Sequence, residues 1–293
     1  MEIKNDADDG FAEFLRNEIG VPVAGPAGTG TPRYDQNQVR EFWRSQAVEH
    51  GQSSAASWSD TPVIDLEIRN ISNYLSDGDE VLDVGCANGY STMHYAAARG
   101  IRVLGLDYIP EMIEQAGQRL TSGPKLEGTP SFRVGNITAL DLDDGVFDKV
   151  IVTRVIINLG EWTNQLRGIM ECVRVLKPGG LLLMSEATLQ GWRRMNSFRR
   201  EWDLPDIQMP PFNNYLNEEL LLAETAGVLD AVDIVNFAST YFVGTRVLKP
   251  LLIRALNIDV DVADPNLNWN HWFSQLPAAG DYGTQKLFVL RKR

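Results

Sequence analysis

Between residues 80 and 186 the chain alternates short apolar runs with segments whose apolar residues recur at helical spacing. The apolar runs are continuous rather than interleaved with polar residues, which is typical of strands that are buried on both faces. Strands of this kind, when they are joined by helices, form a parallel sheet with helices on each side. The sequence therefore predicts a doubly wound α/β fold, with strands at 81–84, 102–106, 132–134, 147–153 and 180–185.

The segments outside this core have a different character. Residues 1–19 form an acidic stretch with an amphipathic pattern, and the Pro/Gly-rich stretch that follows cannot sustain a helix or strand. Residues 187–216 and 239–283 show no clear period, and insertions this long in a compact domain are usually lids. We expect both to lie over the carboxyl end of the sheet, where open α/β sheets bind ligands. The predicted divisions are a tail and linker (1–33), an N-terminal helical cap (34–79), the core (80–186), a first insertion (187–216), a core helix and strand (217–238), a second insertion (239–283) and the last core strand (284–293).

The charge of the chain limits its partners. Its 293 residues contain 27 Lys and Arg against 39 Asp and Glu, a net charge of −12. A phosphate backbone is bound by a basic field, and here the overall field has the opposite sign, so we expect no nucleic-acid partner. The sequence carries no pattern that determines the oligomeric state, and a homodimer stays open.

The start of the chain and its cysteines bear on the compartment. The first nine residues are acidic and lack the basic-then-apolar pattern of a signal peptide, and no apolar run approaches the roughly 18 residues of a membrane span. The two cysteines, Cys86 and Cys172, offer neither a disulfide framework nor a zinc site. We therefore expect a cytoplasmic protein with no membrane partner and no metal.

The most informative segment is the loop after the first predicted strand. Gly85 and Gly89 stand between that strand and a helix that opens at once. Such a turn lets a ligand approach the backbone and directs helix N–H groups at negative charge. Asp107 ends the second predicted strand, 24 positions after Asp83. A carboxylate at that place in a doubly wound fold holds a ribose diol, so the pair of strands predicts a nucleotide-like ligand.

A dinucleotide-binding loop would carry the pattern G-x-G-x-x-G. Here Ala87 and Tyr90 take the second and third glycine positions. The loop therefore gives weak support for NAD.

Asp83-x-Gly85-x-Ala87-x-Gly89 resembles instead the acidic, glycine-rich first motif of class I S-adenosylmethionine-dependent methyltransferases. Four further segments match that family's motifs in order and spacing: Leu104–Asp107, Val134–Ile137, Phe147–Thr153 and Arg174–Leu181. The resemblance covers about residues 80–186. It implies a Rossmann-like, mostly parallel seven-stranded sheet with an antiparallel last strand and helical lid insertions. It also implies S-adenosyl-L-methionine as the cofactor and S-adenosyl-L-homocysteine as the product.

The resemblance further implies which residues hold the cofactor. Asp107 would accept hydrogen bonds from both ribose hydroxyls, Thr153 would lie beneath the sulfonium, and Asp83 would contact the amino group indirectly. Cys86 is counted with the cofactor loop, although a small packed residue is the simpler interpretation of it. The remaining contacts are implied for Gly85, Ala87 and Gly89 (methionine part), Tyr108 and Met112 (faces of the adenine), Asn136 or Ile137 (adenine edge) and Trp43 (roof).

The acceptor site is predicted from polar residues near the carboxyl end of the sheet. Methyl transfer from a sulfonium is an in-line displacement in which the protein chiefly aligns the acceptor with the methyl group. Arg154 and Asn158 follow the fourth predicted strand and are predicted to bind the acceptor. Trp192, Arg193 and Tyr215 of the first insertion are added to them, since arginines match carboxylate and phosphate geometry. The alternative for the arginine cluster is a solvated helix face.

A hydroxyl acceptor would need a general base. Of the three histidines in the chain, His271 lies in the second insertion, where a lid would reach the acceptor. We name it as the candidate catalytic base, with a polar histidine that packs in the lid as the alternative.

These residues together predict a methyltransferase that acts on an oxygen or nitrogen atom of a small polar metabolite. The arginines near the acceptor site would also suit an anionic metabolite. Two alternatives stay open. The first is an NAD(P)-dependent oxidoreductase on a similar sheet, and the second is a non-catalytic protein that binds S-adenosylmethionine.

Overall fold

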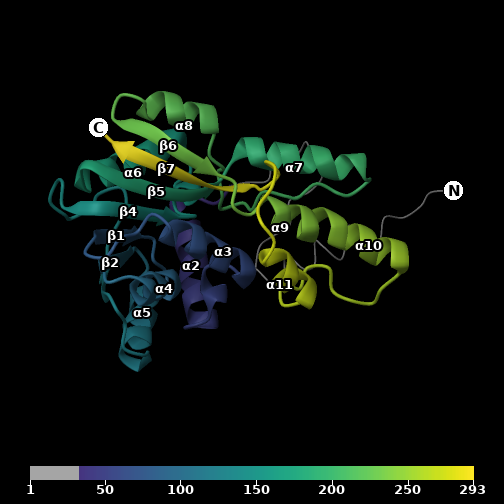
Figure 1. The fold of residues 1–293 in the computed structure, drawn as a ribbon, viewed down its shortest axis with the longest axis horizontal. Coiled ribbons are helices and arrows are strands. Elements are labelled where there is room, and N and C mark those ends of the chain that lie inside the picture. The colour runs from purple at the N-terminus through teal and green to yellow at the C-terminus, as the bar shows by residue number, and fades with distance from the viewer. Residues whose placement is uncertain (1–32) are drawn as a thin grey trace.

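A computed structural model describes residues 33–293 of the chain (Figure 1). The amphipathic pattern and most of the linker predicted for 1–33 lie outside the described residues. Among the described residues, no helix combines the length and the apolar character needed to cross a membrane.

A seven-stranded sheet forms the centre of the molecule, with strand order β3-β2-β1-β4-β5-β7-β6. The first five strands pair in parallel, and β7 runs antiparallel to both β5 and β6. The prediction of a doubly wound, mostly parallel sheet with an antiparallel last strand is confirmed. The strands are β1 (Glu80–Val84), β2 (Arg102–Asp107), β3 (Thr129–Val134), β4 (Phe147–Thr153), β5 (Leu176–Ala187), β6 (Leu229–Val235) and β7 (Gln285–Lys292).

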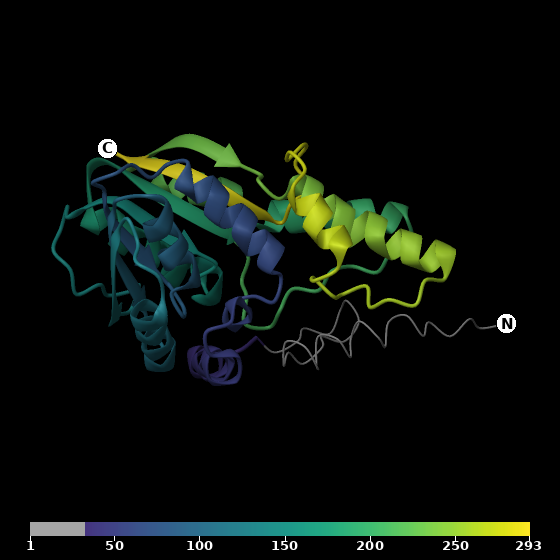
Figure 2. The ribbon, with the colours of Figure 1, turned by 60° about the horizontal axis from the view of Figure 1, so that its bottom comes forward.

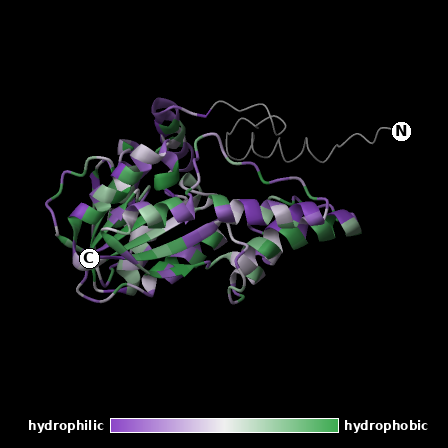
Figure 3. Ribbon diagram, turned by 90° about the horizontal axis from the view of Figure 1, so that it is seen from above, coloured by the Kyte–Doolittle hydropathy of each residue, from purple (hydrophilic) through white to green (hydrophobic). Residues whose placement is uncertain are grey.

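Helices cover both faces of this sheet. Successive side chains of a strand point to opposite faces, so Val81 packs in the cluster of α3 and α4, while Leu82 and Val84 pack in the cluster of α6 and α8. Figure 3 shows the strands mostly in the apolar colour and the helices in both colours, as expected for buried strands and half-exposed helices. These helices are α3 (Thr61–Ser72), α4 (Tyr90–Ala98), α5 (Pro110–Ser122), α6 (Trp162–Val175) and α8 (Glu218–Thr225).

One further helix, α2 (Gln36–His50), precedes the sheet in the chain. The Asp35 side chain caps its start by accepting hydrogen bonds from the backbone N–H groups of Asn37 and Gln38, both at 2.9 Å. This cap satisfies N–H groups that have no partner within the helix. Figure 2 shows α2 (purple) beside α5.

Both insertions contain helices, as the resemblance to the methyltransferase family implies, although their sequences show no clear period. They form a helical lobe that extends beyond the carboxyl end of the sheet (Figure 1). Apart from the 13-residue helix Leu189–Glu201, the helices of the insertions have at most eight residues, and helices this short leave little periodicity because packing against neighbours stabilises them. The helical lobe comprises α7 (Leu189–Glu201), α9 (Ser239–Val243), η3 (Gly244–Leu248), α10 (Lys249–Leu256) and α11 (Asn268–Ser274).

Buried polar contacts attach the helical lobe to the N-terminal cap. Asp60, which precedes α3, is 3% exposed. The Tyr241 hydroxyl donates to its Oδ1 and the Arg246 guanidinium donates to its Oδ2, each at 2.6 Å. Asn270 Nδ2 in turn donates to the Tyr241 hydroxyl at 2.9 Å. A network of hydrogen bonds centred on Asp60 therefore joins the lobe to the start of α3.

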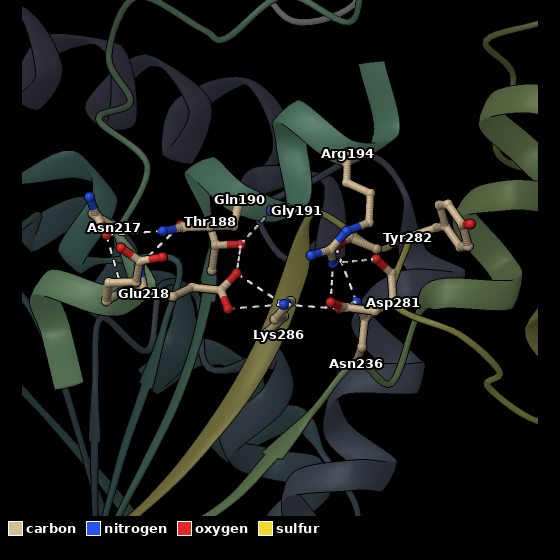
Figure 4. Close-up of polar contacts among 12 residues, drawn as sticks. Thr188, Gln190, Gly191, Arg194, Asn217, Glu218, Asn236, Asp281, Tyr282 and Lys286 are labelled. Atoms are coloured by element: carbon tan, nitrogen blue, oxygen red, sulfur yellow. Dashed lines mark hydrogen bonds and ion pairs between the residues drawn. The ribbon is translucent and has the colours of Figure 1, made fainter. Parts of the chain in front are cut away.

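A second ionic network attaches the lobe to the sheet (Figure 4). Lys286 of β7 is nearly buried, and its Nζ lies 2.9 Å from Glu218 Oε1 and 2.9 Å from Asp281 Oδ1. Arg194 of α7 pairs with the same Asp281, and the Thr188 hydroxyl donates to Glu218 Oε1 at 2.7 Å. A buried lysine requires such partners. The network therefore holds α7 and the end of the second insertion in place on β7.

Candidate active site

A cavity of about 420 Å³ opens at the carboxyl end of the parallel strands. Its walls come from the loop after β1, the ends of β2 and β4, the segment after β3, and one side of α2. A cavity of this size at this place is the expected position of a ligand in an open α/β sheet.

The loop after β1 is tightly folded against its surroundings. Gly85 has φ +77°, and a Cβ there would lie 2.1 Å from Val155 Cγ2. Gly89 has φ +73°, and a Cβ there would meet the Phe132 ring at 2.8 Å. Both positions therefore require glycine, because other residues rarely adopt this φ and have no room.

Ala87 is the departure from the glycine-rich motif, and its backbone takes a glycine-like conformation. Its φ is +48°, in the left-handed region. That conformation costs an alanine about 1–2 kcal/mol relative to the right-handed one. The turn survives because the Gly85 and Cys86 N–H groups donate to Leu106 O at 2.6 and 3.0 Å, and Ala87 N–H donates to Asp107 Oδ2 at 3.0 Å. The substitution thus changes the energy of the loop and leaves its shape intact.

Asp107 is held in a defined orientation at the end of β2. Its second oxygen, Oδ1, accepts from the Ile109 N–H at 2.9 Å. The carboxyl is 8% exposed, and burial raises its pKa to about 6 against the lowering effect of the backbone hydrogen bonds. Each carboxylate oxygen can accept a second hydrogen bond, so a diol facing the cavity finds both oxygens pre-oriented.

Asp83 lies deeper in the same wall. The Thr92 hydroxyl donates to Asp83 Oδ2 at 2.6 Å, and burial raises the pKa of this carboxyl to about 6. Cys86 is buried beside it, and burial raises the pKa of its thiol, as does the nearby charge of Asp107. A thiol in this state is a poor nucleophile, in keeping with its interpretation as a packed residue.

The next part of the cavity is partly apolar. Tyr108, Met112 and Ile137 line it, and Met112 packs in a small cluster with Trp43. Asn136 Oδ1 accepts from the Thr138 N–H and hydroxyl, both at 3.0 Å. These two contacts fix which side of the Asn136 carboxamide faces Thr138.

Helix α2 forms the roof. Trp43 Nε1 donates to Asn158 Oδ1 at 3.4 Å, and Gln36 Nε2 donates to Asn158 O at 3.2 Å. On the other side, Arg44 Nε donates to Glu111 Oε1 of α5 at 2.7 Å. The helix therefore spans the cavity from α5 to the short 3₁₀ helix η2 (Ile156–Asn158).

Arg154 and Asn158 form the end of the cavity beyond β4. Arg154 has φ +56°, and Asn158 Nδ2 donates to its carbonyl oxygen at 2.6 Å. The Arg154 guanidinium forms an ion pair with Glu67 of α3 and lies 5.3 Å from the centre of the Trp58 ring. The predicted anion-binding arginine therefore already has a carboxylate partner.

A family model described as a methyltransferase domain matches residues 82–184. The O-methyltransferase resE of Aspergillus sclerotiorum is 29% identical over 161 residues, which are 54% of this chain and 59% of that protein. A probable S-adenosylmethionine-dependent methyltransferase of Mycolicibacterium smegmatis is 38% identical over 109 residues, which are 37% of this chain and 38% of that protein. The chain carries a class I S-adenosylmethionine-dependent methyltransferase domain. The match spans less than two thirds of the length of each of these relatives.

Solved structures share the fold of this methyltransferase domain. The PH0226 protein of Pyrococcus horikoshii superposes with a TM-score of 0.55 at 17% identity, covering 86% of this chain and 99% of that chain. The phosphoethanolamine N-methyltransferase 1 of Haemonchus contortus also has a TM-score of 0.55, at 15% identity, covering 88% of this chain and 48% of that chain. At these identities the likeness shows the fold alone.

The residues of this methyltransferase domain fit its cofactor, S-adenosylmethionine. Asp107 is a buried carboxylate at the cavity, and each of its oxygens can accept a further hydrogen bond. The structure brings all of the predicted cofactor residues to this cavity or its loop. Those that line the cavity are Trp43, Asp83, Gly85, Cys86, Ala87, Asp107, Tyr108, Met112, Asn136, Ile137 and Thr153.

Four predicted acceptor and catalytic residues lie elsewhere, since none of them is among the described residues that line the cavity. Trp192 Nε1 donates to Ile207 O at 2.8 Å, and Tyr215 packs against the hydrophobic core. Arg193 lies on α7, and His271 is exposed on α11 with its Nε2 2.6 Å from the Gln275 amide. The reason is geometric: α2 covers the cavity, while the helical lobe extends past it.

Three of the four arginines on α7 are likewise engaged in structural contacts. Arg194 pairs with Asp281, and Arg200 pairs with Asp206. Arg199 is buried and donates from Nε to Pro205 O at 2.8 Å. These pairings support the alternative interpretation of the cluster as a structural helix face.

Sequence reasoning missed the polar residues that α2 and α6 bring to the cavity. Gln36, Asn37 and Arg40 share one side of α2 with Trp43. Gln36, Arg40 and Trp43 follow one another at intervals of four and three positions, about one turn of a helix, and this spacing was the available signal. Asn164 lines the cavity from the first turn of α6 and belongs to no motif. No described group of three or more His, Cys, Asp or Glu side chains could hold a metal ion.

Proposed function

We propose that this protein transfers the methyl group of S-adenosylmethionine to an oxygen or nitrogen atom of a small polar molecule. The observation that carries the proposal is a single cavity beneath α2. One side of it, here called the cofactor wall, is formed by the loop after β1 and by Asp107, and it continues into a polar end at Asn158. The cofactor supplies an electrophilic methyl group on a sulfonium. The protein's task is then to hold an acceptor atom in line with that methyl group and to keep water out.

The cofactor wall is built to orient its ligand. Backbone hydrogen bonds fix Asp107, so its oxygens accept from a diol without rearrangement. The left-handed turn at Gly85 and Gly89 lets the ligand approach the backbone. Trp43 and Met112 provide apolar surface for a planar ring.

The acceptor end carries carboxamides. Gln36, Asn158 and Asn164 line it, and each carboxamide can both donate and accept a hydrogen bond. Such groups suit hydroxyl, carbonyl and amide groups of a neutral acceptor. Because Arg154 is paired with Glu67, this end gives no support to the anionic acceptor that the sequence allowed.

The relatives do not favour one acceptor atom. Their names include the malonyl-[acyl-carrier protein] O-methyltransferase of Erwinia billingiae, 30% identical over 140 residues, and the Haemonchus contortus enzyme named above is an N-methyltransferase. Both oxygen and nitrogen therefore stay in the proposal.

A cytoplasmic location forms part of the same proposal. Its support is the acidic composition and the two thiols, Cys86 and Cys172, which are both free and buried. A homodimer is compatible with the proposal and is not required by it.

Calorimetric titration with S-adenosylhomocysteine, beside NAD, tests the proposed function. Asp107→Ala should weaken S-adenosylhomocysteine binding by about 1.5–3 kcal/mol, because it leaves hydrogen bonds to a charged acceptor unmade. Asp230→Ala is the matched control, since Asp230 is exposed on β6 and pairs with Arg293 away from the cavity. Binding of NAD instead would decide for the oxidoreductase, and binding without turnover over a broad acceptor panel would decide for a non-catalytic protein.

A further inference from the structure

Arg154 poses an electrostatic problem for a methyltransferase. It follows Thr153 at the carboxyl end of β4, and the residue is part of the cavity lining. A sulfonium cofactor carries a positive charge, so a cation in the same low-dielectric wall would repel it. The neutral product has no sulfonium and would feel little of this repulsion.

The structure places a carboxylate against this arginine. Glu67 lies on α3, outside the residues that match the methyltransferase family model, and its side chain is 1% exposed. Its Oε2 pairs with Arg154 Nη1, although the two residues lie 87 positions apart. Its Oε1 accepts from the Ser185 hydroxyl of β5 and from Gln285 Nε2 of β7, the latter at 3.3 Å. Glu67 is therefore held by donors from β5, from β7 and from the residue that follows β4.

Other groups around the guanidinium contribute less directly. The Trp58 ring lies on one side of it, at 5.3 Å from its centre. Asp83 of β1 and Glu186 of β5 are buried nearby, and the Arg154 charge lowers the pKa of each, although burial keeps both values raised. Glu67 differs from these two because it contacts the guanidinium directly.

We propose that Glu67 compensates the charge of Arg154 and thereby sets the relative affinity of the site for the sulfonium cofactor and its neutral product. Glu67 acts through Arg154 and does not line the cavity itself, so it is a positioning residue. The inference rests on the proposed function, because it needs the cofactor in this cavity. It predicts that removal of Glu67 and removal of Arg154 change the ratio of the two affinities in opposite directions.

The test measures the dissociation constants of S-adenosylmethionine and S-adenosylhomocysteine by calorimetry for each variant. Glu67→Gln leaves Arg154 uncompensated and should weaken S-adenosylmethionine binding about three- to tenfold more than S-adenosylhomocysteine binding, the size expected for an added charge in a partly solvated site. Arg154→Gln leaves Glu67 uncompensated and should shift the ratio the other way. The double variant should return the ratio to that of the wild type.

Glu80→Gln is the matched control, because it also removes one carboxylate from an ion pair, here with Arg102 at the opposite end of the sheet. It should leave the ratio unchanged. Circular dichroism reports whether each variant folds. If Glu67→Gln does not fold, Arg154→Gln alone still tests the direction in which the ratio of the two dissociation constants changes.

An equal change for both ligands in Glu67→Gln and in Arg154→Gln would overturn the proposal, because it would show that the pair acts only on structure. A wild-type protein that binds neither ligand would instead overturn the proposed function. The two failures are therefore distinguishable in the same experiment.

Discussion

Glu186 offers a test of how burial affects stability at this site. The residue lies on β5 and is fully buried. Its Oε1 accepts from the backbone N–H groups of Val155 and Ile156, both at 2.8 Å, at the start of the segment that ends the cavity. Its Oε2 has no hydrogen-bond partner in the part of the chain that the structure describes. Burial raises the pKa of this carboxyl to about 8, although the backbone donors lower it.

The sign of the pH dependence follows from that shift. Between the ordinary pKa of a glutamate and about 8, the folded protein keeps a proton that the unfolded chain has released. The contribution of Glu186 to stability is therefore fully present below the ordinary pKa and is lost as the pH rises through about 8. Across this window the loss is about 1.4 kcal/mol per pH unit.

Glu186→Gln removes the titration and keeps an oxygen that can accept from the two N–H groups. The free energy of unfolding of the variant minus that of the wild type should rise by about 3 kcal/mol between about pH 5.5 and 7.5. Urea unfolding followed by tryptophan fluorescence, repeated across this range, measures the difference. Groups that titrate equally in both proteins cancel in the subtraction.

Glu224→Gln, at an exposed position of α8, is the control, and its difference from the wild type should stay flat over the same range. Parallel pH profiles for Glu186→Gln and the wild type would refute the reasoning. They would mean that the buried carboxyl is ionised in the folded protein at neutral pH.

Three further substitutions test the helical lobe. Gly244→Ala should lower the free energy of unfolding by about 1–3 kcal/mol, measured by urea unfolding, because the new Cβ would lie 2.1 Å from Phe273 Cδ1 in a packed interior; an unchanged midpoint would contradict the packing. Tyr241→Phe should cost about 1.5–3 kcal/mol in the same assay, because Asp60 loses a donor to a charged group, and a neutral result would mean that the pair is not formed. His271→Ala should leave both stability and S-adenosylhomocysteine affinity unchanged, since the side chain is exposed outside the cavity; a tenfold loss of affinity would return it to the site.

The sheet and the cofactor wall were accessible to sequence reasoning because their signals are local. Continuous apolar runs identify strands that are buried on both faces, and a glycine-containing turn followed by Asp107 at the next strand end indicates where a ligand sits. Helices in the insertions were implied by the resemblance alone, because the residues of the insertions show no clear period and most of these helices are short and depend on packing against neighbours. β5 also begins at Leu176, earlier than the predicted 180, because its first residue pairs with Phe147 across a register shift.

The acceptor end was decided by the tertiary structure. The sequence places Arg154 at a strand end, but it cannot show that Glu67, from a helix 87 residues earlier, neutralises it. It places His271 in an insertion. It cannot show that this insertion extends past the cavity and that α2 covers the cavity instead.

The sequence by itself determined the succession of strands and helices along the chain, the glycine-containing loop after the first strand and the position of Asp107 at the end of the second. The reason is that these depend on residues adjacent in the chain and on the periodicity of strands and helices. Only the tertiary structure decided which charges are paired and which segment forms the roof. Those outcomes depend on contacts between segments that are distant in the chain. Packing, and the free-energy cost of burying a charge without a partner, determine which of these segments meet.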